Sequence, residues 1–102
     1  MQEGIMAAYV VLATFTDQGV KTAKDSPKRA EAFKQMAKTF GGTVKDIFWT
    51  QGRYDIVSIT DAPDELSATA LNLSLSALGN VRTESLRAFS AEEMAKITAK
   101  ML

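Results

Sequence analysis

The sequence predicts an α+β domain of the ferredoxin-like type, a four-stranded antiparallel sheet with two helices on one face. Three observations lead to this prediction. Strand and helix patterns follow one another in the order β-α-β-β-α-β, with one more helix at the C-terminus. A short connection containing glycine joins the two middle strands, as in a β-hairpin. Right-handed crossovers then place the first and third strands at the centre of the sheet.

The first half of the chain predicts one strand and one helix. Residues 7–15 are rich in β-branched and aromatic residues and form too short a run for a helix, so they predict a strand. Residues 16–25 are polar and predict a loop or a loose helical turn. Ser26 as the N-cap and Pro27 at the first helical position predict a helix start. An apolar stripe follows, and Gly41-Gly42 predicts the helix end.

The second half predicts two strands, a helix, a strand and a final helix. Residues 43–50 and 54–60 have strand composition, and Gln51-Gly52-Arg53 connects them. Acidic residues and a proline between 61 and 65 predict the start of a helix that runs to Leu78. Residues 81–89 predict the fourth strand, and Ser90 with Glu93 forms a capping box for the last helix.

Composition excludes several classes of chemistry. The 102 residues predict a single domain, 1–102, with 12 Lys+Arg against 12 Asp+Glu and neither Cys nor His. Thiol nucleophiles, disulfides, imidazole catalysis and the usual zinc ligands are therefore excluded, and we expect no metal and no cofactor. A neutral chain has no general attraction to nucleic acid or to anionic membranes. No apolar run could span a membrane and residues 1–5 lack the features of a secretory signal, so we expect a cytoplasmic protein.

The first strand predicts a homodimer, because it is apolar on both faces. Tyr9 and Val11 lie on one face, and Val10 and Leu12 on the other. The two helices can cover only one face, and soluble monomers rarely expose a large apolar patch. Two copies with their sheets facing each other would bury the second face.

The second predicted helix is also apolar over a broad surface. It carries two apolar stripes, Leu66-Ala70-Leu73-Ala77 and Leu71-Leu75-Leu78. The terminal helix or a neighbouring subunit would cover the second stripe.

The segment Gly52-Arg53-Tyr54-Asp55 begins a resemblance to a known family. Further matching segments are FTDQGVKT (15–22), SPKRAEAF (26–33), DAPD (61–64) and NVRTESLRAF (80–89). With these segments the chain resembles the GYD-domain family over residues 8–94. The resemblance implies a dimeric α+β-barrel type of fold, a bacterial or archaeal source and no established activity.

The hairpin supplies the first candidate site residues. Gly52 is interpreted as a turn residue. Tyr54, at the predicted start of the third strand, either packs its ring at the core or acts as a ligand donor or phenolic acid. Asp55, on the opposite face, either forms a structural ion pair with Arg53, Arg82 or Arg87, or acts as a substrate-binding or proton-accepting carboxylate.

Four further residues are candidates for ligand binding. Trp49 either packs in the core or an interface, or stacks on a flat ligand; Arg53 and Arg82 are possible ligand partners. Lys21 belongs to a group of cations at the start of the first helix, which is either a solvated face or an anion site.

Three functional hypotheses follow. The first is a homo-oligomeric small-molecule-binding or structural module without an assignable reaction. The alternative is a cofactor-free enzyme of the monooxygenase or isomerase type, using Tyr54 and Asp55 in a pocket between sheet and helices. RNA binding is disfavoured, because the third strand lacks the aromatic pattern of RNA-recognition motifs and the chain is neutral.

Overall fold

The structure is a computed structural model that describes residues 6–102. The segment 1–5, which we interpreted as carrying no secretory signal, lies outside the described residues. Among residues 6–102, no helix combines the length and the apolar character that crossing a bilayer requires.

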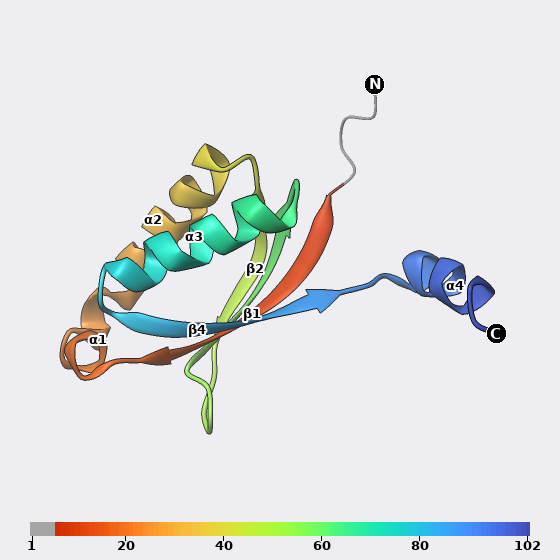
Figure 1. Ribbon diagram of the computed structural model, residues 1–102. Coiled ribbons are helices and arrows are strands. Elements are labelled where there is room, and N and C mark those ends of the chain that lie inside the picture. Colours follow the sequence, from red (N-terminus) through yellow and green to blue (C-terminus); the bar gives the residue numbers. More distant parts are fainter. Residues whose placement is uncertain (1–5) are drawn as a thin grey trace.

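The four strands form one antiparallel sheet in the order β2-β3-β1-β4 (Figure 1). The strands are β1 (Ala7–Phe15), β2 (Thr43–Trp49), β3 (Ile56–Ala62) and β4 (Val81–Ala88). The first and third strands are central, as the connection rules predict. The predicted ferredoxin-like α+β fold is confirmed.

Two long helices, α2 (Ser26–Thr39) and α3 (Glu65–Ala77), cover one face of the sheet (Figure 1). The segment after β1 holds the short helix α1 (Asp17–Lys21) and a single 3-10 turn, η1 (Ala23–Asp25). A loose helical turn was one of the two predictions for this segment, and it is correct. The side chain of Thr16 caps α1 by accepting a hydrogen bond from the Gly19 amide.

Two predicted element starts are wrong. Ser26 is the first residue of α2 instead of its N-cap; its buried hydroxyl accepts a hydrogen bond from Trp49 Nε1 at 2.8 Å. Tyr54 does not begin the third strand, because β3 starts at Ile56 and the hairpin loop includes Tyr54 and Asp55. In both places a long-range contact or the loop geometry determines the boundary, and local propensity does not reveal it.

The core lies between the sheet and the helical layer. One buried cluster joins Tyr9 and Val11 of β1 to Ala62 and Ala68. A second joins Phe33 and Ala37 of α2 to Leu71 of α3, with Leu75 packed against it. Neither predicted cover for the Leu71 and Leu75 stripe is therefore correct: α2 of the same chain packs on it, as the shared cluster shows. The other stripe of α3 remains outside, with Leu66 84% and Leu73 66% exposed.

The second face of the sheet has no helix over it (Figure 1). Strand register places eight apolar residues on this face, which we call the open face. They are Ala8, Val10, Leu12, Phe48, Val57, Ile59, Leu86 and Ala88. The edge-strand members are well exposed, Phe48 at 56% and Leu86 at 46%. The apolar second face expected from β1 thus extends across all four strands.

The last helix, α4 (Ala91–Ala99), lies beyond the end of β4, apart from both the sheet and the other helices (Figure 1). The predicted capping box is present: the Ser90 side chain accepts from the Glu93 amide at 3.1 Å, and the Glu93 carboxylate accepts from the Ser90 amide at 2.9 Å. The helix start is therefore well defined although the helix has no neighbour within its own layer.

Candidate functional site

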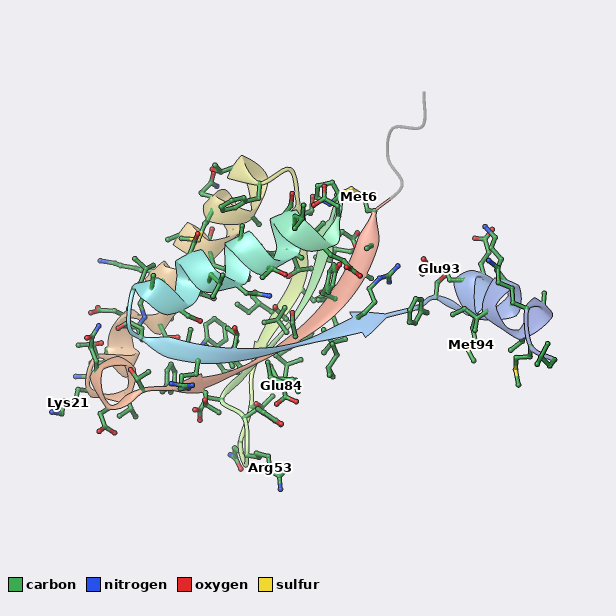
Figure 2. All side chains as sticks on the ribbon, in the orientation of Figure 1. Met6, Lys21, Arg53, Glu84, Glu93 and Met94 are labelled. Atoms are coloured by element: carbon green, nitrogen blue, oxygen red, sulfur yellow. The ribbon has the colours of Figure 1, made fainter. Side chains whose placement is uncertain are left out.

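The β2–β3 hairpin tip is a tight loop closed by two hydrogen bonds. The Thr50 amide donates to the Asp55 carbonyl at 2.8 Å, and the Thr50 hydroxyl donates to the Tyr54 carbonyl at 2.7 Å. Gly52 has a φ of 104°, a region that strains residues with a side chain. The loop projects away from the helical layer, with Arg53 at its tip (Figure 2).

Tyr54 and Asp55 are engaged by neighbouring strands. The Tyr54 hydroxyl donates to Glu84 Oε1 on β4 at 2.9 Å. Asp55 Oδ2 accepts from the Phe15 amide at 2.8 Å, and the Asp55 amide donates to the Ala13 carbonyl at 2.9 Å. Asp55 has no ion-pair partner among residues 6–102, so the expected structural ion pair is wrong. A backbone amide at the end of β1 satisfies the carboxylate instead.

A cavity of about 100 Å³ lies between the sheet and the helices. Its walls are almost entirely apolar, with side chains such as Val11, Phe33 and Leu75, and its polar lining comes mainly from Ser26, Ser58, Arg29 and Asn80. Neither Tyr54 nor Asp55 lines it, and Trp49 does not either. The structure therefore does not bring the candidate catalytic pair to the wall of this cavity.

The candidate ligand-binding residues lie in separate places. Trp49, 45% exposed, joins the end of β2 to the start of α2 through its bond to Ser26. Lys21 lies at the end of α1 and Arg53 at the hairpin tip, well apart in Figure 2. Arg82 is exposed on β4. These four residues do not form one site.

The cation group at the start of α2 is partly used within the chain. Arg29 donates to the Thr22 carbonyl and hydroxyl at 2.9 and 3.0 Å and to the Gly19 carbonyl at 3.2 Å. Its guanidinium therefore ties α2 to α1 and the turn that follows. Lys21, Lys24 and Lys28 are exposed. Such charges are solvated unless a ligand gathers them.

The open face is the most extensive candidate functional surface. Its apolar centre is rimmed by polar and charged side chains of both signs, among them Arg82 and Glu84 on β4 and Asp46 on β2. Apolar patches with a polar rim are typical of protein interaction surfaces.

A second surface, which sequence reasoning missed, lies between α3 and the β4 edge. It is an open groove of about 480 Å³, and Leu73 and Asn72 of α3 face Arg82 and Thr83 of β4 across it. Asn72 Nδ2 donates to Ser85 Oγ at 2.9 Å, while Asn72 Oδ1 is buried and finds no donor among the described residues. The groove depends on the packing of α3 against an edge strand, and the only sequence signal is the outer Leu66 and Leu73 stripe.

The comparisons with known proteins agree with this fold. The family model described as GYD domain matches residues 9–98. The chain is 30% identical over 90 residues to a Thermus thermophilus protein named "Glutamine synthetase and cystathionine beta-lyase binding protein". The alignment covers 87% of this chain and 95% of that protein. No solved structure matches the chain. With the family model spanning most of its length, this chain belongs to the GYD-domain family.

Proposed function

We propose that this protein is a homodimeric binding module whose partner is another protein. The observation that carries the dimer is the open face, eight apolar residues on four strands with no helix over them. Two copies packed face to face would remove this surface from water, a favourable term of roughly 25 cal/mol per Å² before association costs. A neutral chain does not repel its own copy through net charge.

Light scattering over a dilution series tests the dimer. We expect the mass of two chains at micromolar concentration and above. Leu12→Lys places a charge at the centre of the open face and should shift the chain to a monomer that keeps its circular dichroism spectrum. Gln35→Lys, on the exposed side of α2, is the matched control and should leave the dimer intact. A full-length chain that stays monomeric at high micromolar concentration overturns the dimer.

The relative's name supports a protein partner. That protein is named for binding glutamine synthetase and cystathionine β-lyase. In a sheet-to-sheet dimer, α3 stays outside, and its exposed Leu66 and Leu73 and the adjacent groove provide apolar and hydrogen-bonding surface. We infer that a partner enzyme of this kind docks on α3.

A direct binding measurement tests this inference. Purified glutamine synthetase and cystathionine β-lyase are each titrated against the immobilised protein, with serum albumin as the negative control. Leu73→Lys should weaken binding by about tenfold or more, while Gln35→Lys should not. Equal binding by both variants would place the contact elsewhere, and no binding of either enzyme would count against this class of partner.

The small-molecule ligand and the cytoplasmic location expected from the sequence stay predictions. The cofactor-free enzyme is not proposed, because Tyr54 and Asp55 both lie away from the cavity between sheet and helices.

A further inference from the structure

The helix α4 has an apolar stripe that nothing in its own chain covers. Met94, Ile97 and Met101 recur at helical spacing and are 50%, 36% and 71% exposed. Isolated helices shorter than about 12–15 residues are marginal in water, and α4 has nine residues. A helix this short needs packing on its apolar side to be stable, so the stripe requires a partner surface.

The start of α4 is held in a fixed direction. Arg87 donates to the carbonyl groups of Ala8 and Ala88, and its Nη2 lies 3.4 Å from Glu93 Oε2. The same guanidinium lies 4.5 Å from the centre of the Phe89 ring. Glu93 is also a member of the capping box. These contacts join the first turn of α4 to the ends of β4 and β1, so the direction of the helix is built in.

The stripe and the open face lie on the same side of the molecule. Leu12 pairs with Glu84, so Glu84 belongs to the open side of the sheet. Figure 2 shows Met94 pointing to the side on which Glu84 and Arg53 lie, away from α2 and α3. A body that packs on the open face therefore approaches from the side towards which the α4 stripe is turned.

We propose that α4 is an arm that packs its Met94-Ile97-Met101 stripe on the second copy of the chain bound at the open face. The proposal rests on the homodimer proposed above and extends its interface to a helix outside the sheet. In a two-fold dimer each copy gives one arm and receives one, so one symmetric contact covers both stripes. The charges of α4 are balanced, Glu92 and Glu93 against Lys96 and Lys100, and do not oppose a neutral partner.

Photo-crosslinking locates the arm's contact. The photoreactive residue p-benzoylphenylalanine replaces Ile97 in one sample and Lys96, on the opposite side of α4, in the control. Each is mixed with 15N-labelled wild-type chain and irradiated. We expect adducts between labelled and unlabelled chains from position 97, with far lower yield from position 96. Adducts only within one chain, or equal yields from both positions, overturn the arm.

A paired substitution measures the arm's contribution in the full chain. Met94→Glu with Ile97→Glu should raise the dimer dissociation constant by about tenfold or more. Ala95→Glu with Ala99→Glu adds the same charge on the other side of α4 and should change it little. If the wild-type chain is a monomer, the homodimer itself fails. If the wild-type chain is a dimer and both pairs behave alike, the arm alone is wrong.

Discussion

At the scale of single residues, the two side chains that looked most chemical hold strands together. Asp55 ends the β1–β3 ladder by accepting the Phe15 amide, and Tyr54 reaches from the hairpin to Glu84 on β4. Both contacts join residues at least 30 positions apart in sequence. The family tetrapeptide 52–55 therefore has a structural account in this chain, a turn followed by two bonds to neighbouring strands.

Asp55→Ala should destabilise the fold, because it leaves the part-buried Phe15 amide without its acceptor. A hydrogen bond to a charged group contributes about 1.5–3 kcal/mol, so a loss of that order is expected in urea unfolding. Asp55→Asn should recover much of it, and Asp46→Ala, at an exposed β2 position, is the control. Unchanged stability of Asp55→Ala would assign the carboxylate a role other than holding β1.

Glu93 should make α4 sensitive to acid. The Ser90 amide, and after it Arg87, holds the pKa of the Glu93 carboxyl below its ordinary value of 4.5. Because the folded pKa is depressed, the added stability is present above that ordinary value and is lost as pH falls through the lowered folded value. Amide chemical shifts of residues 91–99 should follow this titration. Glu93→Gln should remove the pH dependence, and the same acid response in that variant would contradict the assignment.

At the scale of elements, one end of the molecule is closed by a glycine. Gly19 of α1 packs directly on the turn between α3 and β4, where a Cβ atom would meet the Asn80 carbonyl oxygen at 1.9 Å. Thr16 closes the same corner, with its amide bonded to Asn80 and its hydroxyl to Gly79. The two crossover ends of the fold therefore fit together only with a hydrogen atom at position 19.

Gly19→Ala should be strongly destabilising although alanine is the better helix former. Helix propensity favours alanine by about 1 kcal/mol, but a backbone oxygen this close forces α1 to move. Gly52→Ala, where a Cβ meets nothing within 4 Å, should cost only the strain of its positive φ. Thermal unfolding of the two variants should therefore show the larger loss at position 19.

Local signals in the sequence predicted most elements and few of the contacts between them. The capping box, the glycine stop after α2 and the acidic start of α3 act within four residues, so they were predicted correctly; Asp64 accepts from the Ser67 amide at 2.7 Å. Ser26 was assigned the wrong partner because Trp49 is 23 positions away. The position of α4 outside the fold and the α3–β4 groove depend on tertiary packing, which no local pattern reports.

At the scale of the whole molecule, the fold has one finished side and one unfinished side. The helical layer covers one face of the sheet, while the open face and the α4 stripe both leave apolar surface on the other side. A chain of 102 residues has little core to spare, so stability gained through a second copy is a large share of the total.

The melting temperature should therefore rise with protein concentration. When only the folded chain dimerises, mass action stabilises the folded state as the concentration exceeds the dissociation constant. Differential scanning calorimetry over a hundredfold range of concentration should show the rise in the wild-type chain, and Leu12→Lys should abolish it. A melting temperature independent of concentration would separate folding from assembly.

Only Phe89 and Ser90 stand between the end of β4 and the start of α4. A link of this length works as a dial, because each inserted residue turns the following helix by about 100° about its axis. Among homologous chains, gaining or losing one residue here would aim the terminal helix at a different neighbour and change the assembly without any change in the core. We expect small-angle scattering of a one-residue insertion variant to show a particle of altered outline built from the same subunit.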